Sequence, residues 1–208
     1  MIARFKSVDD IREAEARLAE SDSKMAELIE KFGPCDITPW QRDLYTSLSS
    51  SIVSQQLSVK AASTIFGRLM AQASDGVTLN HERVLALSHD ELRACGLSNA
   101  KAKYCVSLAT AVKNNDIHFE ELQNLPDESV IEILIQLPGI GRWTAEMFLI
   151  FALGSTDVLA TDDLGLKRGM QRYLSLEDYP EKSLFIEKSA PWKPYRSVAS
   201  WYLWRLAD

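Results

Sequence analysis

The feature that most constrains this chain is a five-residue break, LPGIG at residues 137–141, between two apolar helical segments. Pro138 cannot continue a helix, and Gly139 and Gly141 permit positive φ, so the chain can reverse direction within a few residues. We therefore expect a helical hairpin, with its second helix beginning near Arg142.

The N-terminus of that second helix is a potential anion site. Its first backbone N–H groups lack partners within the helix, and the positive end of the helix dipole lies there, so a phosphate is the natural ligand. A plain helical hairpin explains the segment equally well on its own. The net charge of −6 argues weakly against a nucleic-acid partner. Backbone amides, however, bind a phosphate without changing the net charge.

Helical periodicity continues along the rest of the chain, without a run of alternating, strand-like segments. Ser88 and Glu91 form the pattern of a capping box at one helix start. Helices are expected at about 8–19, 22–32, 40–53, 58–72, 98–114, 164–174, 181–189 and 194–206. Since no long linker or repeat of 20 to 50 residues occurs, the sequence predicts an all-α fold with short connections.

Membrane, disulfide and clustered-metal classes are disfavoured. No stretch approaches about 20 uninterrupted apolar residues, and the charged N-terminus lacks the apolar core of a signal peptide. Three cysteines and three histidines show neither a CxxC pair nor a metal-ligand spacing: Cys35, Cys95, Cys105, His81, His89 and His118. We expect an intracellular protein in a reducing compartment.

Several motifs resemble those of one family. They are SSIVSQQLSVKAASTIFGRL, GLSNAKAKYCVSLA, LPGIGRWTAEMF, DVLATDDLGLKR and WKPYRSVASWYLWR, in this order from about residue 47 to 206. The chain resembles the helix–hairpin–helix DNA glycosylases, and among them the DNA-3-methyladenine glycosylase II branch. The first 35 residues carry no such motif.

The resemblance implies a fold and an activity. The fold is all-α, with two helical lobes and a cleft between them, one lobe from about 1–35 plus 165–208 and the other from about 36–164 with the hairpin. The activity is monofunctional hydrolysis of the N-glycosidic bond of alkylated purines, such as 3-methyladenine, in duplex DNA after base flipping. The expected protein is a monomer of base excision repair, cytoplasmic in a bacterium or nuclear in a eukaryote.

The pair Asp162 and Asp163 precedes a predicted helix. The resemblance implies that Asp163 is the catalytic carboxylate, because it matches the second aspartate of the family triplet. Such a group stabilises the positively charged sugar or orients the attacking water. Asp162 is then expected to be the helix cap, with Asp163 at the first helical position. Asp162→Asn should affect mainly stability, and Asp163→Asn mainly rate.

The base pocket is expected to be partly aromatic. Trp143 and Trp204 match family positions that line it, while Met147 and Leu164 replace tyrosines of a well-known member. Trp143 also stands where bifunctional members have a nucleophilic lysine, which argues against lyase activity. The remaining tryptophans, Trp40, Trp192 and Trp201, are expected in the core.

The DNA contacts are expected from two turns. Gln56, with Leu57 after it, matches the residue that fills the gap left by the flipped base, although Gln55 and Gln56 also fit an ordinary polar turn. At the hairpin, the expected DNA-binding residues are Gly139, Gly141, Arg142 and Thr144. No cofactor is required and no iron–sulfur cluster is expected. A sodium or potassium ion at the Leu137 and Ile140 carbonyls is a further implication of the resemblance.

Two alternatives remain open on the sequence. One is a helix–hairpin–helix module that binds DNA without catalysis, in which both aspartates only cap a helix. The other is a glycosylase for deaminated or oxidised bases, since Met147 and Leu164 make the pocket less aromatic.

Overall fold

The structure is a computed structural model that describes residues 2–39 and 43–208. Its described residues form helices joined by short connections, with two isolated β-bridges, Arg4 to Ser155 and Ser74 to Leu79. The helices are α1 (Val8–Ser21), α2 (Ser23–Phe32), α3 (Leu44–Ser54), α4 (Val59–Ala73), α5 (His81–Ala86), α6 (His89–Ala94), α7 (Asn99–Lys113), α8 (Phe119–Leu122), α9 (Asp127–Leu134), α10 (Arg142–Phe151), α11 (Leu164–Leu174), α12 (Lys182–Lys188), the 3₁₀ helix η2 (Ala190–Trp192) and α13 (Arg196–Ala207). The expectation of an all-α fold is confirmed.

The chain divides into two compact units. Within the described residues, one unit comprises 3–39 with 149–208, and the other comprises 43–148. Residues 149–164, which the sequence assigned to the hairpin lobe, therefore belong with the chain ends. The segment after α10 hydrogen-bonds to residues near the N-terminus: the Phe5 N–H donates to the Gly154 carbonyl at 2.7 Å.

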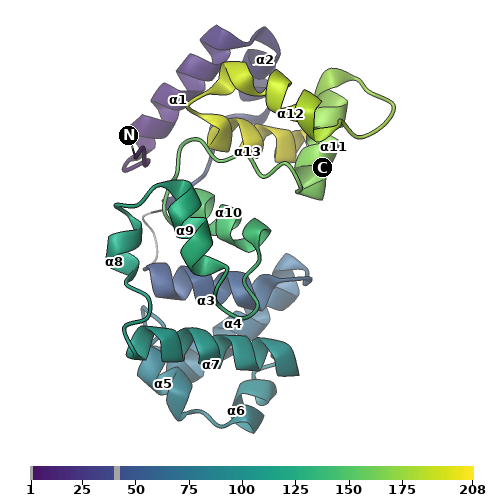
Figure 1. The fold of residues 1–208 in the computed structure, drawn as a ribbon. Coiled ribbons are helices and arrows are strands. Elements are labelled where there is room, and N and C mark those ends of the chain that lie inside the picture. The colour runs from purple at the N-terminus through teal and green to yellow at the C-terminus, as the bar shows by residue number, and fades with distance from the viewer. Residues whose placement is uncertain (1, 40–42) are drawn as a thin grey trace. The chain divides into compact units, whose positions relative to one another are not determined.

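The unit built from the chain ends is organised around α13. This helix packs against α11, α1 and α2, as Figure 1 shows at its upper end. Its buried side chains include Tyr202, whose hydroxyl donates to the buried carboxylate of Glu15 at 2.5 Å. Trp192 is fully buried, which confirms its expected place in the core. Trp201 is half-buried and donates its indole N–H to Asp36.

Helices α11 and α13 cross at very short range. A Cβ added to Gly169 of α11 would lie 2.2 Å from the carbonyl oxygen of Leu203. Gly165, one turn earlier on the same face, is also close to α13, with an added Cβ 2.9 Å from Cδ1 of Trp204. The two glycines therefore allow the backbones to approach where any side chain would separate them.

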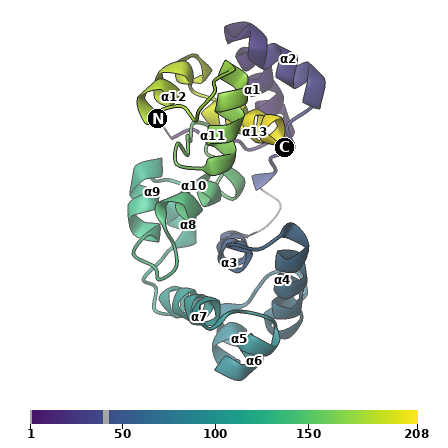
Figure 2. The same cartoon turned by 90° about the vertical axis from the view of Figure 1, so that its right-hand side faces the viewer.

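The internal unit contains α3 to α9 and the beginning of α10. In Figures 1 and 2, α7 lies beside α5, and α3 packs on both α4 and α7. Helix α3 was expected to begin at Trp40, but it begins at Leu44 because the Asp43 carboxylate accepts from the Thr46 N–H at 2.8 Å. Trp40 itself lies outside the described residues. The capping box of Ser88 and Glu91 is confirmed at α6.

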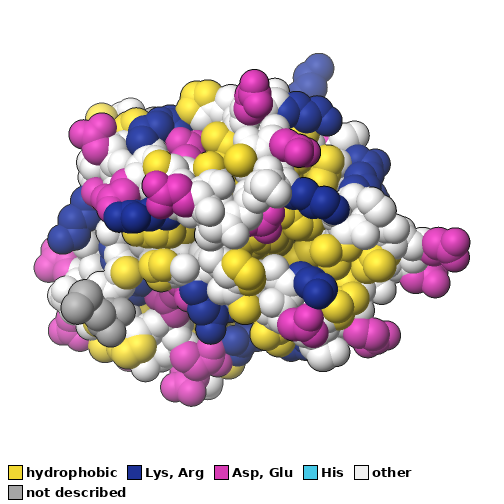
Figure 3. Space-filling model, turned by 90° about the horizontal axis from the view of Figure 1, so that it is seen from above, with side chains coloured by type: hydrophobic (Ala, Val, Ile, Leu, Met, Phe, Trp, Pro, Cys, Tyr) yellow, Lys and Arg dark blue, Asp and Glu magenta, His cyan; other side chains and the backbone are white. Residues whose placement is uncertain are grey.

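Charges of both signs are mixed on the surface. On the face that Figure 3 shows, Lys and Arg side chains alternate with Asp and Glu, and hydrophobic side chains lie between them. None of the described helices combines the length and the apolar composition needed to cross a lipid bilayer.

Candidate active site

Asp163, not Asp162, caps α11. The backbone of Asp163 is extended, at φ −67° and ψ 125°, and its Oδ1 accepts from the Leu166 N–H at 2.6 Å. The expected assignment of the cap to Asp162 is therefore wrong. The helix begins at Leu164, as its periodicity indicates, so Asp163 is the residue before the helix and not its first residue, and the carboxylate three residues before the Leu166 N–H is that of Asp163. Asp162 is exposed and lies 3.6 Å from Lys167 and 3.9 Å from Lys182.

A second donor fixes the same oxygen of Asp163. The indole Nε1–H of Trp204, on α13, donates to Oδ1 at 2.8 Å. Trp204 in turn stacks on Phe151, with ring centroids 5.7 Å apart and an interplanar angle of 30°. The carboxylate is thus held beside the Trp204 indole, which is itself stacked on Phe151. Leu164, the expected pocket residue that follows it, is 65% exposed.

The approach of α13 to α11 makes this contact possible. A Cβ on Gly165 would lie 3.1 Å from Asp163 Oδ1 and 3.3 Å from Trp204 Nε1. Glycine at this position therefore leaves room for the carboxylate and the indole to meet.

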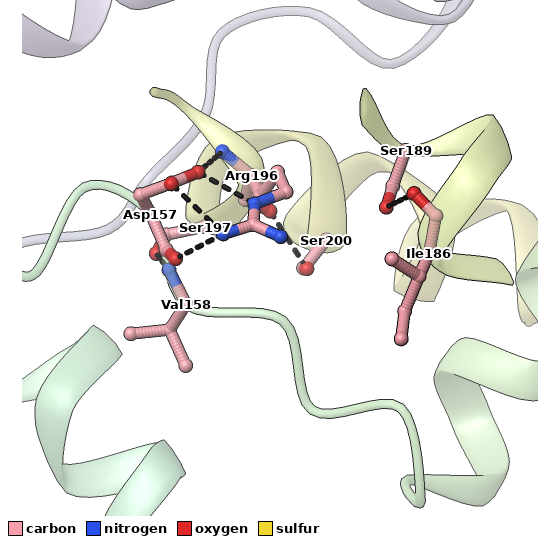
Figure 4. Close-up of polar contacts among 7 residues, drawn as sticks. All are labelled: Asp157, Val158, Ile186, Ser189, Arg196, Ser197 and Ser200. Carbon is pink, nitrogen blue, oxygen red and sulfur yellow. Dashed lines mark hydrogen bonds and ion pairs between the residues drawn. The ribbon is translucent and has the colours of Figure 1, made fainter. Parts of the chain in front are cut away.

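The loop that leads to Asp163 is attached to the beginning of α13. Figure 4 shows Arg196 donating to Asp157, with Nε to Oδ1 at 2.7 Å and Nη2 to Oδ2 at 2.8 Å. The next residue of the loop, Val158, donates its N–H to the Ser197 hydroxyl at 2.9 Å. The first turn of α13 therefore binds the loop, and the C-terminal part of the same helix binds Asp163 through Trp204.

The LPGIG segment forms the expected turn, but its two glycines differ. Gly139 has φ +84°, and an added Cβ would lie 2.2 Å from the ring of Tyr104. Gly141 is not among the residues with positive φ, and an added Cβ would meet nothing within 4 Å. Both glycines permit positive φ, but of the two only Gly139 adopts it and needs glycine for the fold.

We expect Gly139→Ala to destabilise the protein by about 2 kcal/mol or more, because the left-handed backbone and the Tyr104 ring both oppose a Cβ. Gly141→Ala, two residues away in the same turn, is the matched variant, and it should change stability by less than about 1 kcal/mol. Thermal unfolding of both proteins measures the difference. Equal stability of the two variants would contradict this account of the turn.

Arg142, the first residue of α10, is engaged within the protein. Its Nη1 and Nη2 donate to the two carboxylate oxygens of Glu128 at 2.7 and 2.8 Å, and its Nε donates to Glu146 at 3.2 Å. Hydrogen bonding to Glu128 raises the pKa of Arg142, and the same contact lowers the pKa of Glu128. A DNA phosphate would have to compete with these carboxylates for the side chain, whereas the backbone N–H groups at the helix start are unaffected by them.

The other residues expected on α10 divide between surface and interior. Trp143 is 46% exposed and Met147 is half-buried, while their expected place in a base pocket stays a prediction. Thr144 is buried, and its hydroxyl accepts from Nε2 of Gln55 at 3.3 Å. The burial and hydrogen bond of Thr144 indicate that it stabilises the hairpin, while its expected contact with DNA stays a prediction.

The turn between α3 and α4, called the wedge turn below, presents Gln56 and Leu57, the residues expected to fill the gap left by the flipped base. Gln56 has φ +56°, which is uncommon for a residue with a side chain, and it is exposed together with Leu57. The Leu57 N–H donates to the Ser54 carbonyl at 3.2 Å, which closes the turn. The turn thus directs two exposed side chains outwards from a short, hydrogen-bonded connection.

Among the described residues, no group of three or more His, Cys, Asp or Glu side chains is placed to bind a metal ion. At the hairpin, the Leu137 carbonyl already accepts from the Ile140 N–H at 3.1 Å. A carbonyl oxygen has a second lone pair, so this bond does not prevent it from binding a cation.

A family model described as "HhH-GPD superfamily base excision DNA repair protein" matches residues 49–194. These residues include the wedge turn, the hairpin, Asp157 and Asp163. This match covers well over half of the chain. The chain belongs to the HhH-GPD superfamily.

Individual HhH-GPD relatives agree along nearly the whole chain. The "Alkylbase DNA glycosidase-like protein mag2" of Schizosaccharomyces pombe is 32% identical over 200 residues, covering 95% of this chain and 94% of the relative. "DNA-3-methyladenine glycosylase 1" of the same organism is 34% identical over 208 residues, covering 97% and 91%. A solved structure of the S. pombe 3-methyladenine DNA glycosylase (Mag1), in complex with abasic DNA, has a TM-score of 0.82 at 34% identity, covering 93% of this chain and 95% of that chain.

Three contributors to this HhH-GPD site were missed at the level of sequence. Phe151 looks like an ordinary core residue of an apolar helix, and Tyr104 like an ordinary helix residue, because nothing local indicates their partners Trp204 and Gly139. Nothing local to Lys101 indicates that its ammonium contacts two carbonyls, those of Val53 at the end of α3 and of Gln55 in the following turn. For Gly165 and Gly169 a signal did exist, since two glycines four residues apart on one helix face indicate close packing.

Proposed function

We propose that this protein is a monofunctional DNA glycosylase that hydrolyses the N-glycosidic bond of alkylated purines, of the 3-methyladenine type, in duplex DNA. It acts as a monomer in base excision repair. The observation that carries the proposal is the Asp163 carboxylate, which Leu166 and Trp204 orient beside exposed aromatic surface in a chain of this superfamily.

The chemistry requires one well-placed negative charge. An alkylated purine is cationic, so it departs with the electron pair of the glycosidic bond and leaves an oxocarbenium-like sugar. Asp163 stabilises this cation and orients a water molecule, whose oxygen bonds to C1′. Asp163 accepts the proton that the water loses and passes it to solvent, and the products are the free base and an abasic site. Trp204 and Leu166 both donate to Oδ1, which leaves the orientation of the carboxylate fixed during the reaction.

Selection of the damaged base rests on aromatic surface. The exposed ring of Phe151 and the half-buried ring of Trp204 stacked on it suit an electron-poor base, because cation–π attraction adds about 0.5–2 kcal/mol per contact. Trp143 carries no amine that forms a Schiff base with the sugar, so the reaction ends at the abasic site.

The hairpin binds DNA through the phosphate backbone. The N–H groups at the start of α10 bind a phosphate without adding net charge, which suits a protein of charge −6. The carbonyl oxygens of Leu137 and Ile140 are hard donors that suit a sodium or potassium ion, which would supply positive charge next to that phosphate.

Release of free 3-methyladenine from methylated duplex DNA tests this function. Wild-type protein should release the base, and borohydride should trap no covalent protein–DNA adduct. Binding of the duplex without any release would instead support a non-enzymatic DNA-binding module. An adduct would mean a lyase with a nucleophile other than Trp143, and release only of deaminated or oxidised bases would reassign the lesion.

A further inference from the structure

The turn between α3 and α4 has an unfavourable backbone that needs external support. Gln56 occupies the left-handed region at φ +56°, where a residue with a Cβ is less stable than glycine. Within the turn itself, the Leu57 N–H to Ser54 carbonyl bond closes the chain. The Leu57 side chain that follows is 39% exposed. The conformation of the turn therefore depends on neighbouring elements.

Lys101, on α7, supports this turn from one side. Its ammonium donates to the carbonyl of Val53 at 2.7 Å and to that of Gln55 at 2.6 Å. The last carbonyls of a helix have no intrahelical partner, and a cation there also interacts favourably with the helix dipole. Partial burial lowers the pKa of Lys101, as expected for an ammonium withdrawn from water. The lysine thus acts as a cap for the C-terminus of α3.

Gln55 supports the turn from the other side. Its side-chain Nε2 donates to the Gly139 carbonyl at 2.9 Å and to the Thr144 hydroxyl at 3.3 Å. The residue whose carbonyl Lys101 binds therefore reaches both the hairpin turn and the first turn of α10. All of these residues belong to the same compact unit. A continuous set of hydrogen bonds joins α7, the wedge turn and the hairpin.

We propose that Lys101 and Gln55 are positioning residues that fix the wedge turn to the phosphate-binding hairpin. The inference rests on the proposed function. When the hairpin binds the DNA backbone, this connection places Gln56 and Leu57 at a set distance from the bound phosphate. Binding of the backbone is thereby coupled to insertion of the wedge, and Lys101 contributes from inside the protein rather than as a phosphate ligand.

Lys101→Met tests the proposal, because it removes the donors and keeps the aliphatic stem. The substrate is one dimethyl-sulfate-methylated oligonucleotide, used single-stranded and annealed to its complement, with free 3-methyladenine as the product. We expect kcat/KM on the duplex to fall at least tenfold, and release from the single strand, where no pair must open, to change less than threefold. Lys103→Met is the matched control, since it removes an exposed charge from the same helix and should affect neither rate.

A second measurement does not depend on catalysis. In a duplex containing a tetrahydrofuran abasic analogue, 2-aminopurine opposite the gap fluoresces more strongly when the wedge unstacks it. Lys101→Met and Gln55→Met should each reduce this increase at saturating protein, and the double variant should add little to either, because both act through one connection. Lys101→Arg, which retains donors for the carbonyls, should restore part of the signal.

Several results would overturn the proposal. If Lys101 were a phosphate ligand, Lys101→Met would lower the slope of log affinity against log salt by about one, and the proposal expects an unchanged slope. Equal losses on the duplex and the single strand, or equal effects of Lys103→Met, would also exclude a positioning role. Failure of wild-type protein to release any base would reject the proposed function instead, whereas unchanged variants of an active wild type reject only this inference.

Discussion

Asp163→Asn should reduce release of 3-methyladenine by roughly 10²- to 10⁴-fold while leaving the fold intact. Asparagine caps helices as well as aspartate does, and its Oδ1 can accept from the Leu166 N–H and the Trp204 indole as the carboxylate oxygen does. The substitution therefore removes the negative charge and little else. Single-turnover release rates, with thermal unfolding of the same samples, measure both effects. The stability should change by less than about 1 kcal/mol.

Asp162→Asn is the matched control. Asp162 is exposed, and its contacts with Lys167 and Lys182 are long surface ion pairs, which are worth under about 1 kcal/mol. Neither stability nor rate should change appreciably. A large loss of activity in both variants, with stability preserved, would mean that the two carboxylates work together. An active Asp163→Asn protein would remove Asp163 as the catalyst.

Gly169→Ala should destabilise the protein by about 3 kcal/mol and should also lower activity at temperatures where it remains folded. The new Cβ would lie 2.2 Å from a backbone oxygen of α13, which cannot rotate away as a side chain can. The helices must separate, and this movement carries the Trp204 indole away from Asp163. Thermal unfolding gives the first effect and single-turnover release the second.

Gly67→Ala provides the comparison for a helical glycine without this restriction. Gly67 lies in α4, and an added Cβ would meet nothing within 4 Å. Alanine there should stabilise the protein by about 0.5–1 kcal/mol through helix propensity alone. If Gly169→Ala behaved like Gly67→Ala, the close crossing of α11 and α13 would not exist in solution.

The fold was predictable from the sequence wherever local chemistry determines it. Apolar periodicity gives α11 with its observed ends, and Ser88 with Glu91 gives the start of α6. The site was less predictable at single-residue resolution. A shift of one residue in a helix start exchanges the roles of two adjacent aspartates, and sequence signals locate helix ends only to within a residue or two. That uncertainty is larger than the difference between Asp162 and Asp163.

Long-range contacts account for the rest. The sequence shows that Gly139 and Gly141 are both able to adopt positive φ, but only the position of Tyr104, on a distant helix, shows which one must be glycine. Similarly, the spacing of residues on α7 places Lys101 on a polar face, and only the packing of α7 against α3 shows that its ammonium binds the end of that helix.

The joining of residues 3–39 with 149–208 in one unit also sets an order of assembly during synthesis. The internal unit is contiguous and emerges from the ribosome before α13, so it can begin to fold while the N-terminal helices still lack their central partner. Asp163 is already synthesised at that stage, but the indole that orients it belongs to the last helix. A nascent chain would therefore form the hairpin within the internal unit before it forms the contact between Asp163 and Trp204.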